Sequence, residues 1–473
     1  MLIEAPLPFI KDFIESVDQS LQEISPHARL SLTQKGWLSF CCLAIAIINT
    51  VCWAKFSRSS LGRHSEKGLC WMFCHSKIHW ESILIASVGV ILSKYGISRG
   101  TLVIDDSDRQ RSKSTKRVFA THKVKDKKTG GYFMGQNVVM LVLVTPSITL
   151  PVGFSFYLPD PEMSKWTQLN KQFIKEGKKE RPEKPAKNLN YPTKTEIALS
   201  LLDEFETHFP QIKVHCILAD ALYGCHSFFK QAGEKFGGVQ VISQLKSTQK
   251  VFYKGRERSL QDFFPMQTPL TKKIQIRGEK EQKVRVGSAR LRVKAHGVKR
   301  FVIALKHEGE THYRYLVASD LSWRTDDIVS AYTLRWLLEV FLQDWKSYEG
   351  WGQLAKQFDE DGSRRALILS LLLDHCLFFH PDQLTCLENK LPAFTVGSLL
   401  ETIRAQSLLQ FIKSLFEVDT HRQTLEKLTE AIQETFELRR SKKHIANRDL
   451  GKMDAADSLH YRNKEALASD AAA

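Results

Sequence analysis

The sequence predicts an α/β protein in which a mixed sheet is flanked by helices, interrupted by a β-rich insertion, with helical regions at both ends. Two features of the pattern carry this prediction. After residue 100 three apolar strands follow one another, and later strands alternate with helices, so the later strands need parallel crossovers. From about residue 250 to 320 apolar residues recur at every second position, as in half-buried strands.

The length of 473 residues allows two to four domains with a full core. Changes of pattern along the chain divide it into five regions. We expect a helical N-terminal region (1–95), a first part of the α/β core (96–248), a β-rich insertion (249–322), a second part of the core (323–380) and a helical C-terminal region with a basic, exposed tail (381–473).

The N-terminal region shows apolar residues at the three- and four-residue spacing of helices. Residues 37–56, WLSFCCLAIAIINTVCWAKF, are nearly long enough to span a bilayer. Because the stretch contains Ser39, Asn49 and Thr50, and no second span follows, we expect a core helix and no membrane partner. No basic signal-peptide segment opens the chain, and its nine cysteines are irregularly spaced, which favours reduced thiols in a cytoplasm.

The core begins with a short strand, TLVIDDSDR (101–109), that ends in acidic residues. Two long apolar strands in residues 133–159 flank a Thr-Pro-Ser turn and predict a hairpin. After a basic, proline-containing segment (175–187) that we expect to be an exposed loop, an amphipathic helix leads to the strand VHCILAD (214–220). A helix and a strand follow, up to residue 246.

The insertion is expected to consist of short strands joined by glycine-containing turns and to carry outward-facing Lys and Arg. The predicted strands are 272–277, 283–287, 289–295, 300–306 and 313–319. Helical spacing then returns at 364–437.

A mostly apolar helix, YTLRWLLEVFLQDWK (332–346), carries one narrow charged stripe. At about 100° per residue, Tyr332, Arg335, Glu339 and Lys346 fall on one side of it. Buried charges need partners, so one reading is an Arg335–Glu339 ion pair that seals a crevice. The other is a carboxylate presented to a metal ion or substrate.

Two strands end in the same way, as an apolar run followed by aspartate. The first leads to Asp105 and Asp106, the second to Asp220. If these strands are neighbours, their carboxylates meet at one edge of the sheet, where they repel one another unless divalent cations lie between them. Oxygen ligands favour Mg²⁺ or Mn²⁺, and two such ions can promote phosphodiester cleavage. Glu339 is the natural third ligand.

Charge favours a polyanionic partner, nucleic acid before membrane. Lys and Arg number 68 against 52 Asp and Glu, which gives a net charge of +16 and a pI near 9.3.

These motifs resemble those of the DDE transposases encoded by bacterial insertion sequences. Tyr332, Arg335, Glu339 and Lys346 match the family's Y-(2)-R-(3)-E-(6)-K signature in full, DDS (105–107) resembles its first-strand motif, and ADALYG (219–224) resembles the motif at its second Asp. The β-rich insertion lies where the IS-four-like group of this family carries one. The resemblance covers roughly residues 100–350.

The resemblance implies an RNase H-like core with Asp106, Asp220 and Glu339 as the catalytic, metal-binding triad and two Mg²⁺ or Mn²⁺ ions per site. It implies cut-and-paste transposition, with cleavage at double-stranded terminal inverted repeats and strand transfer into target DNA. A homodimer on paired ends and a cytoplasmic, nucleoid-associated location in bacteria follow. Tyr332, Arg335 and Lys346 are expected to contact DNA, and residues 1–95 to bind the DNA ends.

The identity of the first carboxylate stays open, because successive side chains on a strand point to opposite faces. Either Asp105 or Asp106 fits the residues alone, and the family pattern favours Asp106.

Several further residues have two readings each. Trp323 could stack on a displaced base, although an aromatic residue there is more often core. Lys113, Lys116, Arg117 and the 175–187 loop could contact phosphates or simply be solvated. Two other functions also compete with transposition: a metal-dependent nuclease of the same core that does not join DNA, and a catalytically inactive DNA-binding relative.

Overall fold

The computed structural model describes residues 6–60, 63–111, 118–126, 129–178, 180–267, 269–274, 282–351, 359–386 and 395–415. Within them, five helices form the N-terminal region, as expected: α1 (Pro8–Ile24), α2 (Leu32–Ile48), α3 (Trp53–Ser59), α4 (Glu66–His75) and α5 (Trp80–Lys94). The expected core helix at 37–56 is divided into α2 and α3, because Asn49 ends α2 in the left-handed conformation at φ 54°. No described helix is long and apolar enough to cross a membrane.

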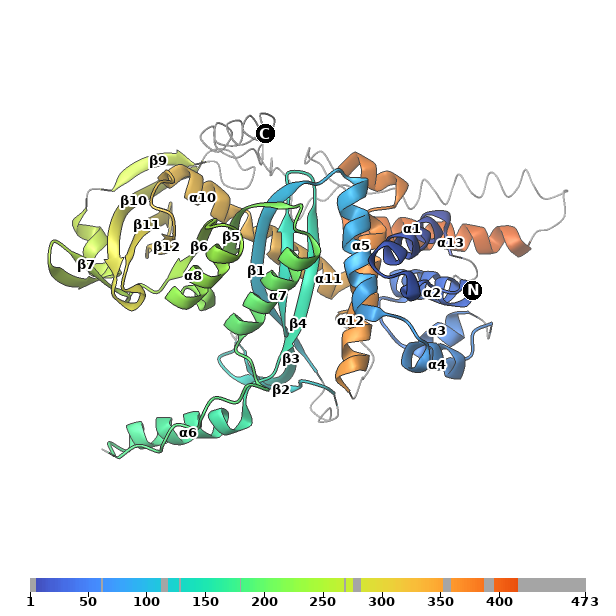
Figure 1. Cartoon of the computed structure of the whole chain (residues 1–473), viewed down its shortest axis with the longest axis horizontal. Coiled ribbons are helices and arrows are strands. Elements are labelled where there is room, and N and C mark those ends of the chain that lie inside the picture. Colours follow the sequence, from blue (N-terminus) through green and yellow to red (C-terminus); the bar gives the residue numbers. More distant parts are fainter. Residues whose placement is uncertain are drawn as a thin grey trace.

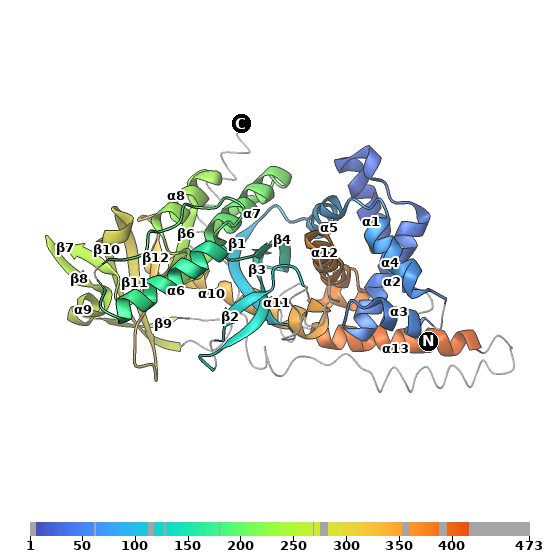
Figure 2. The ribbon, with the colours of Figure 1, turned by 90° about the horizontal axis from the view of Figure 1, so that it is seen from below.

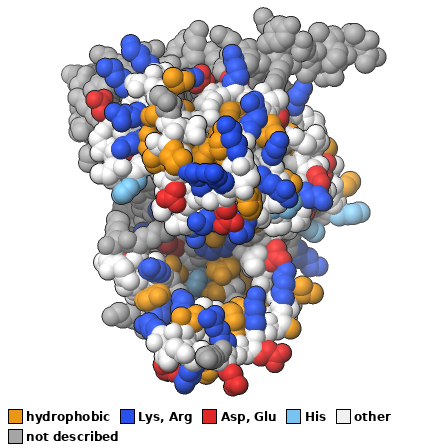
Figure 3. Space-filling view, turned by 90° about the vertical axis from the view of Figure 1, so that its left-hand side faces the viewer, with side chains coloured by type: hydrophobic (Ala, Val, Ile, Leu, Met, Phe, Trp, Pro, Cys, Tyr) orange, Lys and Arg blue, Asp and Glu red, His pale blue; other side chains and the backbone are white. Residues whose placement is uncertain are grey.

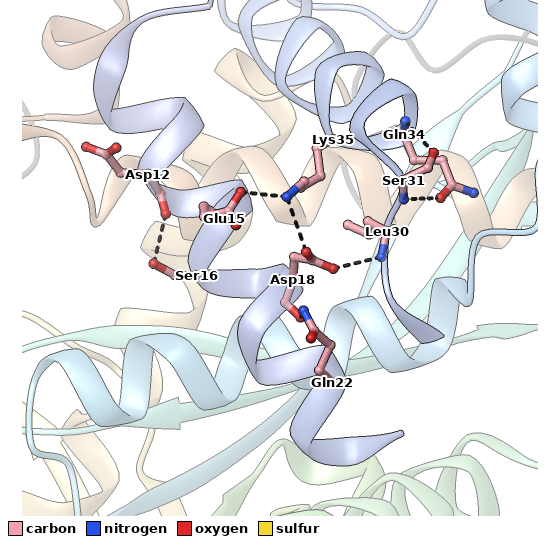
Figure 4. Close-up of polar contacts among 9 residues, drawn as sticks. All are labelled: Asp12, Glu15, Ser16, Asp18, Gln22, Leu30, Ser31, Gln34 and Lys35. Atoms are coloured by element: carbon pink, nitrogen blue, oxygen red, sulfur yellow. Dashed lines mark hydrogen bonds and ion pairs between the residues drawn. The ribbon is translucent and has the colours of Figure 1, made fainter. Parts of the chain in front are cut away.

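A buried carboxylate fixes the connection between α1 and α2 (Figure 4). The side chain of Asp18 is 1% exposed, accepts a hydrogen bond from the Leu30 amide at 2.7 Å and lies 3.4 Å from the Lys35 ammonium. The Lys35 ammonium also reaches Glu15 at 2.8 Å. Ser31 and Gln34 form a capping box that starts α2. The charge of Asp18 is therefore compensated, as buried carboxylates require.

The core confirms the predicted order of strands and helices. It comprises β1 (Arg99–Gln110), β2 (His122–Lys125), β3 (Tyr132–Val144), β4 (Thr149–Tyr157), α6 (Pro161–Lys175), α7 (Lys194–His208), β5 (Lys213–Ala219), α8 (His226–Lys235) and β6 (Gln240–Leu245). β1, β3 and β4 form the expected antiparallel meander, whereas β1, β5 and β6 run parallel. α7 and α11 lie on opposite faces of this sheet (Figure 2). The RNase H-like mixed sheet predicted for the core is thus confirmed.

Two described core elements were not predicted from the sequence, the short strand β2 and the longer helix α6. Helix α6 projects from the sheet and buries none of its residues (Figure 1). The local signals for this helix are Met163, Trp166, Leu169 and Phe173 at helical spacing, the Asp160 cap and Pro161 in the first turn.

The insertion extends the same sheet. Its strands are β7 (Lys250–Tyr253), β8 (Arg256–Ser259), β9 (Leu270–Ile274), β10 (Gln282–Val293), β11 (Lys299–His307) and β12 (Arg314–Ala318), with a one-turn helix α9 (Leu260–Phe263). β12 pairs antiparallel with β6, which gives the order β2-β3-β1-β5-β6-β12-β11-β10-β7-β8. The turn expected near residue 288 is wrong, because β10 runs straight through Gly287. A Cβ there would meet the Phe264 ring at 2.9 Å, so glycine serves close packing and not a turn.

The remaining helices are α10 (Thr325–Thr333), α11 (Arg335–Tyr348), α12 (Glu360–Leu377) and α13 (Val396–Leu415). The predicted single helix over 332–346 is divided at Leu334 into α10 and α11. Buried His375 on α12 joins three elements: its ring nitrogens lie 2.8 Å from the Ser87 hydroxyl on α5 and 2.9 Å from the Pro151 carbonyl on β4. The helices at both ends of the chain therefore pack as one layer beside the sheet (Figure 1). The predicted basic tail (439–444) lies outside the described residues.

Two carboxyl groups are buried where α11 ends against α12. Glu349 is fully buried and Asp374 is 7% exposed. Burial raises the pKa of both, to about 8 for Asp374, and Asp344 nearby raises them further. Both groups therefore hold their protons in the folded chain at neutral pH.

This pair predicts that stability falls as pH rises. Between pH 4 and 8 the unfolded chain loses these protons while the folded chain keeps them, so each group destabilises the fold by up to about 1.4 kcal/mol per pH unit. Asp374→Asn should weaken the fall in melting temperature between pH 6 and pH 8. The exposed control Glu360→Gln should leave it unchanged, and an equal fall in both variants would contradict the assignment.

Candidate active site

Parallel pairing of β1 and β5 brings two aspartates to the same edge of the sheet. Ile104 lies opposite Ala219, so the next residue on each strand is an aspartate, Asp105 on β1 and Asp220 after β5. In parallel strands, residues in register point to the same face. The strand-end juxtaposition predicted from sequence is therefore present for Asp105 and Asp220.

Arg335 connects Asp105 to the signature helix. Its guanidinium donates to the Asp105 carboxylate at 2.7 Å and also pairs with Glu339, one turn further along α11. The Arg335 and Asp105 side chains are 16% and 14% exposed, whereas Glu339 is 41% exposed. Two segments distant in sequence, β1 and α11, thus meet at one cluster of alternating charge.

The surroundings of Asp105 disfavour its negative charge. Burial raises its pKa to about 7, and the charges of Asp220 and Asp106 contribute, although Arg335 opposes them. Burial also opposes the charge on Arg335, but Tyr332 and the carboxylates outweigh it and raise the Arg335 pKa. A cation is therefore what this group of carboxylates requires, and the arginine supplies one.

Asp106 points to the opposite face. Its carboxylate accepts hydrogen bonds from Asn137 on β3 at 2.9 Å and from the Lys194 ammonium at the start of α7 at 2.6 Å. The structure therefore does not bring the Asp106 side chain to Arg335 and Glu339, although the family pattern favours it as the first catalytic carboxylate. Alternation along β1 is the physical reason.

The other two signature residues are Tyr332, which precedes Glu339 in the sequence, and Lys346, which follows it. The hydroxyl of Tyr332 lies 3.5 Å from the Ala219 carbonyl at the end of β5, and burial raises its pKa. Burial lowers the pKa of Lys346, with Asp108, Asp106 and Asp105 opposing that effect. Lys346 forms no ion pair with the described residues, so its ammonium is available to a ligand.

Sequence reasoning missed three residues of this region: Asn137, Lys194 and Tyr223. Tyr223 is fully buried, and the charges of the three aspartates contribute to raising its pKa. Its position in ADALYG, three residues after Asp220, was a usable signal. Nothing local to Asn137 or Lys194 indicates that they meet Asp106.

The oxygen donors suit Mg²⁺ or Mn²⁺, but the side chains are not arranged around an ion. No group of three His, Cys, Asp or Glu in the described part of the chain is close enough to hold a metal. The guanidinium of Arg335 lies between Asp105 and Glu339. The donor set therefore fits a hard cation only if Arg335 turns aside, which exchanges one positive charge for another.

The possible DNA contacts of Trp323 and of the basic residues after β1 can also be compared with the structure. Trp323 is 7% exposed, so it belongs to the core and is not free to stack on a displaced base. Lys113, Lys116 and Arg117 lie outside the described residues.

Removing Arg335 should show separately how it stabilises the fold and how it competes with Mg²⁺ for the carboxylates. Arg335→Ala leaves Asp105 and Glu339 without their cation, and with partial exposure this should cost about 1–3 kcal/mol of unfolding free energy. Mg²⁺ should then raise the melting temperature more in the variant than in the wild type, because it restores positive charge. Arg314→Ala, which breaks an exposed pair with Glu310, should change neither quantity appreciably. If Mg²⁺ raised the melting temperature equally in the wild type and in Arg335→Ala, the proposed replacement of the guanidinium by a metal ion would be contradicted.

Comparison with known proteins identifies part of this chain. Residues 72–288 match the family model described as DDE superfamily endonuclease. No curated protein sequence matches at a significant level. The matched segment contains Asp105, Asp106 and Asp220 and ends before Glu339.

Proposed function

We propose that the chain is a transposase, because residues 72–288 match the family model described as DDE superfamily endonuclease. It cleaves DNA at the ends of an insertion sequence and joins those ends to target DNA. The family supports metal-dependent DNA cleavage. The transfer step is supported by the Y-(2)-R-(3)-E-(6)-K spacing of Tyr332, Arg335, Glu339 and Lys346.

We propose Asp105, Asp220 and Glu339 as the catalytic carboxylates, with Asp105 in place of Asp106. The observation that carries this proposal is the Asp105–Arg335–Glu339 chain of contacts on the face shared with Asp220. Because Asp106 contacts Asn137 and Lys194, its role is to position β1 against α7.

Two Mg²⁺ or Mn²⁺ ions held by these carboxylates would activate the attacking hydroxyl and stabilise the leaving oxygen. The protein supplies the other charges. Arg335, once released from Asp105, and Lys346 can both neutralise phosphate oxygens of the DNA. Tyr332, packed against the end of β5, keeps the start of α11 next to Asp220.

The remaining regions complete the proposal. The five N-terminal helices would bind the terminal inverted repeats, and the β-rich insertion would contact DNA through its outward-facing basic residues. A homodimer would hold two ends together before they are joined to target DNA.

The pair Asp105→Asn and Asp106→Asn tests the site, because the two residues are adjacent and the substitutions are identical. Asp105→Asn should reduce Mg²⁺-dependent cleavage by more than roughly 100-fold, and loss of the pair with Arg335 should lower the melting temperature as well. Asp106→Asn should lower the melting temperature through loss of the Lys194 pair and leave cleavage within about tenfold. The reverse pattern would assign the first carboxylate to Asp106.

Strand transfer distinguishes a transposase from a nuclease. Incubation of the chain and Mg²⁺ with pre-cleaved inverted-repeat ends and a plasmid should yield ends joined to the plasmid. Ends carrying a 3′-dideoxynucleotide should not join, because the attacking hydroxyl is missing. Cleavage of uncut ends without joining would show a nuclease, and neither reaction an inactive relative.

A further inference from the structure

The segment between β4 and α7, residues 158–193, forms an arm that stands away from the sheet (Figures 1 and 2). It consists of α6 and an extended return segment, joined by a hydrogen bond of 2.9 Å from the Trp166 indole to the Pro182 carbonyl. No residue of α6 is buried, and Leu189 on the return segment is 81% exposed. An ordered element with so little burial gains little stability from the core, and its apolar side chains Leu169, Ile174 and Leu189 are open to a ligand.

The arm is basic, and part of its charge is uncompensated. It carries eight Lys and Arg against five Asp and Glu. Lys178 pairs with Glu176, and Lys187 with Glu196, whereas Lys171 and Lys184 form no ion pair with described residues. Seen from the end of the molecule that carries the insertion, Lys and Arg side chains surround a hollow (Figure 3). This distribution fits a polyanion.

A pocket of about 670 Å³ lies where the arm meets the sheet, a volume typical of ligand sites. Three tyrosines and three lysines contribute to its lining: Tyr132, Tyr157, Tyr191, Lys171, Lys184 and Lys187. Tyr132 is 61% exposed, so much of its ring is open to a ligand. Lys123 and Lys194 lie 4.7 and 5.0 Å from the centres of the Tyr132 and Tyr157 rings.

Strand register places this pocket near the candidate active site. Tyr157 lies opposite Asn137, and Asn137 lies opposite Asp108, three residues beyond Asp105 on β1. With strands about 4.8 Å apart and a rise of about 3.3 Å per residue, Tyr157 is roughly 14 Å from Asp105. A DNA strand covers that distance in about four nucleotides at 3.4 Å each. The arm also returns to the sheet at Lys194, which binds Asp106.

The combination of aromatic rings and lysines in the pocket suits unpaired DNA better than a duplex. A paired duplex offers phosphates and groove edges to a protein, whereas an unpaired base also offers its face for stacking. We propose that the arm pocket binds unpaired DNA close to the cleaved bond, with a base against the tyrosines and phosphates on Lys171 and Lys184. The pocket lies on the α7 side of the sheet and Asp105 faces α11, so the bound strand passes around the sheet and needs more than the roughly four nucleotides of the direct distance. The inference rests on the proposed function for the location of the cleaved bond, but not for binding itself.

Binding of the full chain to two probes in Ca²⁺ tests the proposal without cleavage. One probe is a blunt duplex of arbitrary sequence, and the other is the same duplex with a 3′ overhang that carries a fluorescent adenine analogue. The wild type should bind the overhang probe more tightly and quench the analogue through stacking. Tyr132→Ala and Tyr191→Ala should each weaken overhang binding by at least about fivefold, with blunt binding unchanged.

The lysines should act through phosphates. Lys171→Gln and Lys184→Gln should each reduce the salt dependence of overhang binding. The control Lys165→Gln, on the same helix but outside the pocket lining, should leave the preference for the overhang unchanged.

Three results would overturn the proposal. If the variants lose as much affinity for blunt DNA as for the overhang probe, the arm contacts duplex DNA. If all variants bind both probes like the wild type, the arm makes no contact with DNA. If only dimerisation changes, the arm binds a second copy of the chain. If the chain neither cleaves nor joins DNA but keeps the tyrosine-dependent overhang preference, the proposed function fails and the arm pocket stands. If it cleaves and joins DNA while the variants bind normally, the arm pocket fails alone.

Discussion

The contact on which the site depends is the bridge that Arg335 makes between Asp105 and Glu339. Acidic side chains from a β-strand, a strand end and a distant helix repel one another when they converge, and burial makes that repulsion stronger. A positive charge between them removes the conflict. In this structure the charge comes from the signature helix, so the residue that attaches α11 to β1 also compensates the carboxylates.

If the site holds metal ions as proposed, Arg335 would have two states, the one bound to Asp105 and one turned toward a phosphate. Occupation of the site by divalent cations would favour the second state, because the carboxylates then no longer need the guanidinium. Metal binding and the release of a phosphate-binding arginine would thereby be coupled in one exchange. A site of this kind places a positive charge beside its carboxylates before DNA arrives.

Alternation along β1 gives its two adjacent aspartates different neighbours. Asp105 faces α11, and Asp106 faces α7, whose first residue, Lys194, directly follows the arm. The same strand therefore carries the candidate site on one face and anchors the arm on the other. A displacement of the arm by DNA would reach β1 through Lys194, within one residue of the proposed catalytic carboxylate.

Much of this arrangement could be predicted from the sequence. Long β-branched runs and helical spacing identify the meander, the parallel crossovers and the N-terminal helices, and Asp220 follows from an apolar strand that ends in an acid. The choice between Asp105 and Asp106 could not be made, because Leu102, Val103 and Ile104 are all fully buried and their run carries no alternation that marks a face. Helix α6 has helical apolar spacing and a capping aspartate that could have indicated it, whereas Gly287 resembles a turn residue until Phe264 is placed against it.

The central claim is that Asp105, Asp220 and Glu339 share a cation site on the α11 face of the sheet. Crystals of the chain bound to DNA and soaked in Mn²⁺ test it most directly through anomalous scattering. The account predicts an anomalous peak in contact with the carboxylates of Asp105, Asp220 and Glu339, with Arg335 turned away from Asp105. A peak coordinated by Asp106, or an intact Asp105–Arg335 pair beside bound Mn²⁺, would contradict it.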